Sequence, residues 1–197
     1  MYEVIGSVRT RTFRVLWLLE ELDQPYRFIE EAPQSAGIVA LNPLGKVPAL
    51  RVDQDVLTDS VAIMTFLADR HGAFTAPAGS IARARQDALT LYIIDEMDAV
   101  LWSAAKHSFA LPEERRVSGL KPTLGWEYER AVRHLCRRLE KAPYLCGDAM
   151  TLPDILAAHC ADWAKAAKIM PKIPVFDAYL ARMTARPAYA RAATPRT

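Results

Sequence analysis

The chain has 197 residues, of which 51% are hydrophobic and 24% are charged. This composition is typical of a globular protein with a buried core and excludes a disordered chain. Lysine and arginine (25) nearly balance aspartate and glutamate (23), so we expect neither nucleic acid nor an anionic membrane as a partner. No apolar run approaches the about 18 residues of a transmembrane helix, and the first residues carry no apolar segment of signal-peptide length. We therefore expect a cytoplasmic protein of one or two domains.

The number and spacing of the cysteines argue against a disulfide-stabilised protein and against a zinc site. Cys136, Cys146 and Cys160 are odd in number and contain no Cys-x-x-Cys pair, so they do not predict a disulfide framework. Even together with His159 they do not supply the about four ligands of a zinc site at workable spacing. We therefore expect a reduced protein that binds no metal.

Residues 1–75 are predicted to form a small α/β domain. Strands are expected over 1–6 and 26–30, and a hairpin over 47–58 turns at Gln54-Asp55. Two helices carry apolar residues three and four positions apart. These are Val15, Leu18, Leu19 and Leu22 in the first helix and Ala62, Ile63, Phe66 and Leu67 in the second. With a short helix before the hairpin, the expected order is β-α-β-α-β-β-α.

The remainder of the chain is predicted to be an all-α bundle. Residues 71–79 contain two glycines and a proline and are expected to form a linker to a helical domain over 80–197. A long helical pattern runs from about Ser80 to Phe109. Three further helices follow: one with the stripe Leu124, Tyr128, Ala131, Leu135 and Leu139, one over Thr151–Lys168, and one marked by Phe176, Tyr179, Leu180 and Met183.

Val47-Pro48 is the first candidate for a binding site. A proline within a strand removes a ladder hydrogen bond, so it belongs at an edge or at a special turn. If the bond between these residues is cis, the amide and carbonyl of Val47 are free to pair with an extended peptide. The alternative is an edge proline that meets no ligand.

Asp59-Ser60, ahead of an apolar helix, is the second candidate. Such a pair is first of all a helix cap, worth about 1 kcal/mol. The same helix start also attracts a carboxylate through its free N–H groups, while the carboxylate of Asp59 suits an ammonium group. Together these are the two charges of an α-amino acid.

The third candidate is the segment Arg9-Thr10-Arg11-Thr12 with Arg14, where the first helix begins. Cations in a first turn oppose the helix dipole, which favours an anion nearby. A hydroxyl at such a helix start can donate to a thiolate and lower the pKa of the thiol below about 8.5. The alternative is a threonine cap surrounded by solvated arginines.

These features occur in the order and spacing of the glutathione S-transferases, which the chain resembles over residues 1 to about 190. The resemblance is carried by SVRTRTFRVLWLLEELDQPY, NPLGKVPAL, LTDSVAI, YLCGDAMTLPDILAAHCADW and the tail RPAYARA. It implies a thioredoxin-like N-terminal domain, an all-helical C-terminal domain and a homodimer. Thr151-Leu152-Pro153-Asp154 resembles the capping box of the family's central helix, so Asp154 is expected to be structural.

By the same resemblance, the backbone of Val47, before cis-Pro48, would pair with the cysteinyl part of glutathione. Asp59 and Ser60 would hold its γ-glutamyl ammonium and carboxylate, and Lys46 would lie near its glycyl end. Related sequences place a serine at the position of Thr10, which would activate the sulfur. Ser7, Thr12 and a backbone N–H are the alternatives for this last role.

The function implied is a glutathione transferase that attacks a small hydrophobic electrophile, with glutathione as co-substrate. The first 135 residues contain no cysteine, which excludes thiol–disulfide exchange by a protein thiol at the first helix. Two alternatives remain: a glutathione-dependent peroxidase or isomerase, and a non-enzymatic binding or regulatory protein of the same fold. Trp102, Lys106, His107 and Phe109 are interpreted either as the lining of the electrophile pocket or as ordinary packing and surface.

Overall fold

The structure is a computed structural model that describes residues 1–195, so the last two residues of the expected helical domain lie outside it. The strands are β1 (Tyr2–Gly6), β2 (Tyr26–Glu30), β3 (Ala49–Val52) and β4 (Asp55–Thr58). The α-helices are α1 (Thr12–Glu21), α2 (Ala36–Leu41), α3 (Ser60–His71), α4 (Ile81–Ile93), α5 (Ala99–Ala105), α6 (Leu120–Leu139), α7 (Leu152–Ala167), α8 (Pro174–Thr184) and α9 (Pro187–Ala193). Two π-helical segments, η1 (Ile94–Asp98) and η2 (Lys106–Ala110), and a 3-10 turn, η3 (Glu113–Arg115), complete the set.

The chain divides into two compact units. One comprises Met1–Thr75 together with the chain from Thr184 onward, and the other comprises Ala76–Met183. The segment from Thr184 onward thus groups with the first unit, whereas the sequence analysis assigns it to the helical domain. The family's expected fold is present: a mixed α/β unit and a helical unit.

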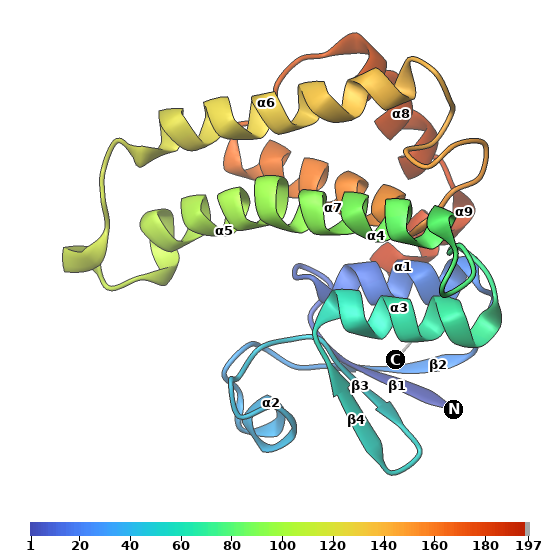
Figure 1. The fold of residues 1–197 in the computed structure, drawn as a ribbon. Helices are drawn as coiled ribbons and strands as arrows, with labels where there is room; N and C mark the ends of the chain where they lie inside the picture. Colours follow the sequence, from blue (N-terminus) through green and yellow to red (C-terminus); the bar gives the residue numbers. More distant parts are fainter. Residues whose placement is uncertain (196–197) are drawn as a thin grey trace. The chain divides into compact units, whose positions relative to one another are not determined.

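The first unit is built on a four-stranded sheet in the order β2-β1-β3-β4. β1 runs parallel to β2 and antiparallel to β3, and β3 pairs antiparallel with β4 as the predicted hairpin. Helices α1 and α3 lie over one face of this sheet, and α2 lies on the other side (Figure 1). Ile38 of α2 packs there against Ile5 and Ala49.

Helix α1 is the most deeply buried element of this unit. Every residue from Thr12 to Leu19 is buried, which exceeds a single amphipathic stripe because α1 is covered by the sheet, by α3 and by α9. The ring of Tyr189 on α9 meets the rings of Phe13 and Trp17 edge-on, at centroid distances of 5.2 and 5.0 Å. Arg186 adds an ion pair with the nearly buried carboxylate of Glu21. The last described helix therefore completes the core of the first unit.

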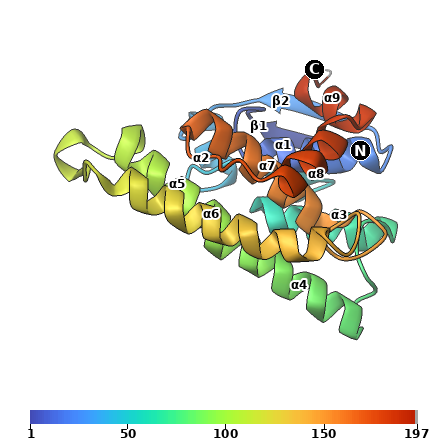
Figure 2. The same ribbon diagram turned by 90° about the horizontal axis from the view of Figure 1, so that it is seen from above.

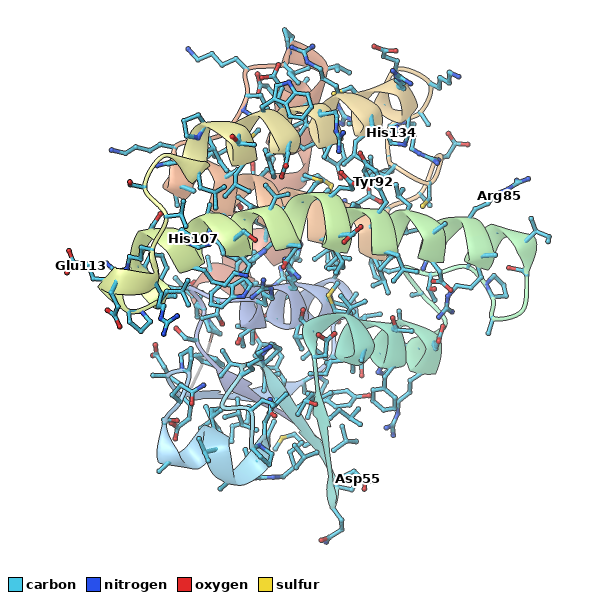
Figure 3. All side chains as sticks on the ribbon, turned by 60° about the vertical axis from the view of Figure 1, so that its left-hand side comes forward. Asp55, Arg85, Tyr92, His107, Glu113 and His134 are labelled. Atoms are coloured by element: carbon cyan, nitrogen blue, oxygen red, sulfur yellow. The ribbon has the colours of Figure 1, made fainter. Side chains whose placement is uncertain are left out.

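The second unit is an antiparallel helical bundle. α4, η1, α5 and η2 follow one another as an almost continuous helix, and α6 runs back beside it (Figure 2). The rings of Tyr92 on α4 and His134 on α6 contact one another at a tilt of 38°, with centroids 4.7 Å apart (Figure 3 labels both). All five residues of the predicted α6 stripe are buried. Helix α7 is the central element, with ten of its sixteen residues buried.

The N-terminus of α7 is fixed by a buried carboxylate. Asp154 accepts a hydrogen bond from the N–H of Thr151, as expected of the capping box, and further ones from the hydroxyl of Thr151, the N–H of Leu145 and the hydroxyl of Tyr179. Burial raises the pKa of Asp154 above its usual value, and the hydrogen bonds that the carboxylate accepts offset only part of that rise.

No helix within residues 1–195 is long and apolar enough to cross a bilayer.

Candidate functional site

Gly6, at the end of β1, is the point where two of the predicted segments meet. A Cβ atom on Gly6 would lie 2.2 Å from Oγ1 of Thr12 and 3.1 Å from Cβ of Val47. Its φ of 151° lies in the region that favours glycine. The absence of a side chain here lets the start of α1 and the turn before β3 approach the same strand end.

The hydroxyls before α1 form a short hydrogen-bonded chain. Thr10 Oγ1 donates to the carbonyl of Ser7 at 2.7 Å. Because that bond uses the only proton of the Thr10 hydroxyl, the 2.9 Å contact with Thr12 is donated by Thr12. The Thr12 N–H also donates to Thr10 Oγ1, at 3.2 Å. Thr10 thus receives two hydrogen bonds and donates one.

The three candidate hydroxyls differ in access. Thr12 is fully buried, so in this structure its hydroxyl cannot touch a ligand directly. Thr10 and Ser7 are both half-buried. Within residues 1–195 the side chain of Ser7 has no hydrogen-bond partner. Their greater exposure therefore makes Thr10 and Ser7 better candidates than Thr12 for a hydroxyl that contacts a bound ligand.

The turn before β3 is held by Asn42, which is buried. Its Nδ2 donates to the carbonyl of Lys46 at 2.9 Å, and its Oδ1 accepts from the N–H of Leu44 at 3.2 Å. The Lys46 side chain is exposed, and the following Val47–Pro48 peptide bond is cis. Among residues 1–195, no group pairs with the backbone of Val47, so this stretch offers a donor and an acceptor to a ligand.

Asp59 and Ser60 begin α3. Oδ1 of Asp59 accepts from the N–H groups of Val61 and Ala62 at 2.8 and 3.1 Å. The φ of Asp59 is 70°, a conformation uncommon for residues other than glycine and often found at functional sites. Its exposed carboxylate keeps a second oxygen that no group within residues 1–195 contacts. Asp59 therefore caps the helix and still presents negative charge to solvent, so both interpretations made from the sequence are compatible with the geometry.

Ser60 lies directly behind this cap and is almost fully buried. Its hydroxyl accepts from the guanidinium of Arg14 at 3.4 Å, and Arg14 itself is fully buried. The alternative interpretation, a threonine cap surrounded by solvated arginines, therefore does not hold for Arg14, whereas Arg9 is exposed. A cation and a helix N-terminus meet at Ser60, which suits a carboxylate.

The helical unit holds the other candidate side chains. Phe109 is exposed and lines a half-open depression of about 350 Å³ between the ends of α5 and α7, η2 and the start of α6. Trp102, Lys106 and His107 do not line it. Nδ1 of His107 instead accepts from the N–H of Val117, which ties the following loop to η2 (Figure 3 labels His107). Within residues 1–195 no group of three or more His, Cys, Asp or Glu side chains is arranged to hold a metal.

Comparison with known proteins identifies the family. The model of the glutathione S-transferase N-terminal domain matches residues 10–70, and that of the C-terminal domain matches residues 102–187. The chain belongs to the glutathione S-transferase family. The family member GstA of Escherichia coli O157:H7 is 31% identical over 152 residues, which is 75% of this chain and 72% of that protein.

Solved structures of the family share the fold. The glutathione transferase of Methylococcus capsulatus str. Bath matches with a TM-score of 0.84 and 24% identity, over 98% of this chain and 97% of its own. The theta-class enzyme of Xanthomonas axonopodis pv. citri, solved with glutathione bound, matches with a TM-score of 0.81 and 24% identity, over 99% and 98%. At this identity the likeness bears on the fold and not on substrates.

Three residues of the site are not predicted as site residues by the sequence. Asn42 lies in a predicted turn, Gly6 ends a predicted strand, and Arg14 belongs to the basic cluster at the first helix. A signal for Arg14 does exist, because it lies four residues before Leu18 and therefore on the buried stripe of α1.

Proposed function

We propose that the protein is a glutathione transferase, with glutathione as co-substrate and a small electrophile as acceptor. Glutathione would lie in extended form along Val47, with its cysteinyl backbone paired to the open donor and acceptor there. Its γ-glutamyl end would reach Asp59 and Ser60, where the ammonium meets a carboxylate and the carboxylate meets a helix start. Lys46 would neutralise the glycyl carboxylate.

The observation that carries this proposal is the hydrogen-bonded chain at the start of α1. Thr10 Oγ1 accepts two hydrogen bonds from Thr12, which polarises its own O–H and makes it a better donor. A thiolate would compete for that proton with the neutral carbonyl of Ser7, and hydrogen bonds to ions are the stronger ones. Thr10 would therefore contact the sulfur, while the buried Thr12 supports it from behind.

The reaction is a substitution or addition in which the protein supplies binding, orientation and thiol activation. The thiol proton leaves to solvent as the thiolate forms. The sulfur then forms a bond to the electrophilic atom, and any leaving group departs with the pair of electrons of the broken bond. In keeping with the family resemblance, we propose that the enzyme works in the cytoplasm as a homodimer, in detoxification.

Three matched variants test the assignment of the hydroxyl: Thr10→Val, Thr12→Val and Ser7→Ala. The readout is the pKa of bound glutathione, followed by thiolate absorbance across a pH series. Losing one hydrogen bond to a thiolate should cost about 1.5–3 kcal/mol, so Thr10→Val should raise that pKa by about 1–2 units. Ser7→Ala should leave it unchanged, and Thr12→Val should raise it by less. If Ser7→Ala raises the pKa and Thr10→Val does not, Ser7 is the activating residue.

A further inference from the structure

An aromatic face of α1 begins directly after the hydroxyl chain of the candidate site. Phe13, which follows Thr12, is buried, and its ring centroid lies 5.9 Å from that of Trp17, one turn further along the helix. The N–H of Phe13 donates to the carbonyl of Thr10 at 3.1 Å. A contact that fixes the ring of Phe13 therefore also constrains the turn that carries the hydroxyls of Thr10 and Thr12.

Tyr189 of α9 packs against this aromatic face. Its ring meets those of Phe13 and Trp17 edge-on, so the three aromatic rings contact one another. Edge-to-face contacts are directional as well as attractive, because the positive edge of one ring meets the negative face of the other. Ala188 and Ala192 of the same helix are buried, and their small side chains let α9 approach α1 closely. The ring of Tyr189 is thus a rigid support for Phe13.

The ion pairs between α9 and α1 lie at the opposite end of α1. Arg186 and Arg191 pair with the carboxylates of the last two residues of that helix. At 1.5 Å per residue, these two residues lie about 12–14 Å along the helix from Thr12. The ion pairs therefore hold the end of α1, whereas Tyr189 supports its first turn, and the two kinds of contact can be perturbed separately.

The hydroxyl chain tolerates little movement of this first turn. Thr12 donates to Oγ1 of Thr10 from its own hydroxyl at 2.9 Å and from its N–H at 3.2 Å. A donor–acceptor distance of about 3.6 Å is no longer a hydrogen bond, so a displacement of about 0.5 Å breaks the N–H contact and weakens the other. The donor strength of Thr10 thus depends on a position that is set outside the site.

We propose that Tyr189 is a positioning residue for the thiolate site. Its ring, packed against Phe13 and Trp17, holds the first turn of α1 so that Thr12 stays within hydrogen-bond reach of Thr10. Tyr189 acts through Thr12 and not on the sulfur itself. The inference rests on the proposed transferase function and goes beyond it, because that function assigns no role to α9.

The pKa of bound glutathione, followed by thiolate absorbance across a pH series, is the first readout. Tyr189→Ala removes the supporting ring and should raise this pKa by about half a unit, which is about a threefold fall in the acidity constant of the thiol. Tyr189→Phe keeps the ring and should leave the pKa unchanged. The exposed Arg191→Gln is the matched control on the same helix, because it breaks an ion pair at the far end of α1 and should not change the pKa.

A double variant separates positioning from a general loss of packing. If Tyr189 acts through Thr12, then Tyr189→Ala should raise the pKa by less in a Thr12→Val background than it does alone, because one of the hydrogen bonds that it supports is already gone. Fully additive shifts would overturn the proposal. So would an unchanged pKa in a Tyr189→Ala protein that folds and binds glutathione. If Tyr189→Ala does not fold, Tyr189→Leu, which keeps most of the side-chain volume, replaces it under the same two criteria.

Amide hydrogen exchange of the full chain without glutathione tests the same support independently of the reaction. The N–H groups of Thr12 and Phe13 both donate within the first turn. Tyr189→Ala should speed their exchange several-fold relative to the amides of the buried strand β3, whereas Tyr189→Phe and Arg191→Gln should not. Unchanged exchange there would overturn the role of Tyr189 even if the wild type forms a thiolate. Faster exchange in a protein whose wild type forms no thiolate would instead contradict the proposed function, and with it the site that Tyr189 supports, so the two failures are distinguishable.

Discussion

Asp154→Ala tests whether one buried carboxylate holds the helical unit together. The substitution removes the side-chain acceptor of four donors: the Leu145 N–H, the Tyr179 hydroxyl, and the N–H and hydroxyl of Thr151. The Tyr179 hydroxyl keeps its contact with the backbone carbonyl of residue 154, at 3.3 Å. The Thr151 groups are partly buried and can turn to water, whereas Leu145 and Tyr179 are buried.

The magnitude follows from the two buried donors. The Leu145 N–H, a buried donor left unsatisfied, costs about 1–3 kcal/mol, and the weaker bond that remains to the Tyr179 hydroxyl adds up to about 1 kcal/mol. Removing a carboxylate that burial disfavours offsets part of this cost. We therefore expect a loss of about 2 kcal/mol in the free energy of unfolding. For a chain of this size that lowers Tm by about 4–8 °C.

Thermal and urea unfolding, followed by circular dichroism, measure the loss. The exposed Asp148→Ala, in the loop before α7, is the matched control and should change the free energy of unfolding by less than about 0.5 kcal/mol. A loss below about 1 kcal/mol for Asp154→Ala would refute the view that its hydrogen bonds fix the start of α7.

The same carboxylate gives a pH dependence with a definite sign. Burial raises the pKa of Asp154 in the folded chain, so the folded state binds its proton more tightly than the unfolded state does. The stabilisation linked to this bound proton is therefore fully present below the unfolded pKa of about 3.9 and is lost as pH rises through the folded pKa, while the hydrogen bonds that the carboxylate accepts remain. The destabilisation by Asp154→Asn should accordingly be greatest in acid and should shrink as pH rises. A difference that grows with pH would contradict the raised pKa.

Three further variants test which contacts of the first unit support glutathione binding and stability. Gly6→Ala should push the start of α1 away from the strand end through its clash with Thr12, and should weaken glutathione binding at least about tenfold, measured by calorimetry. Asn42→Ala leaves the partly buried backbone carbonyl of Lys46 without its donor and should cost about 1–2 kcal/mol in urea unfolding, with a several-fold loss of glutathione affinity; unchanged affinity would show that the turn does not position the ligand. Arg186→Ala leaves the nearly buried carboxylate of Glu21 without its ion pair and should lower the free energy of unfolding by about 1–3 kcal/mol. An unchanged thermal unfolding temperature would show that this ion pair does not hold α9.

Much of the fold follows from local pattern in the sequence. The stripe of α6 follows from apolar spacing, because this helix buries one side, and the β3–β4 hairpin follows from its two-residue turn between short strands. In α3 only Ile63 and Leu67 of the expected stripe are buried, together with Met64 and Ala68, so the stripe predicted for that helix is only partly correct. The capping box at Asp154 was likewise predictable, since its residues lie within one helical turn. The docking of α9 on α1 was not predictable. It depends on Arg186 and Tyr189 meeting residues about 165 positions earlier in the chain, and no local pattern encodes that pairing.

In the candidate site, too, the locally encoded features were predictable and those that depend on tertiary packing were not. Val47-Pro48 and Asp59-Ser60 were singled out because proline at an edge and an Asp-Ser helix start have physical meaning in the sequence alone. The sequence did not predict which of the three hydroxyls, those of Ser7, Thr10 and Thr12, is placed to contact the sulfur. The burial of Thr12 and the direction of the Thr10 proton depend on how closely Gly6 lets α1 approach, which is a tertiary distance.

The central claim is that the start of α1 turns bound glutathione into a thiolate. Titration of the full chain with glutathione at neutral pH, with heat and ultraviolet thiolate absorbance recorded together, tests it most directly. We expect saturable binding with a matching rise in thiolate absorbance, and loss of that rise, with binding retained, in Thr10→Val. Binding without thiolate would contradict the proposed chemistry at Thr10. No binding at millimolar glutathione would contradict the proposed function and leave only the fold.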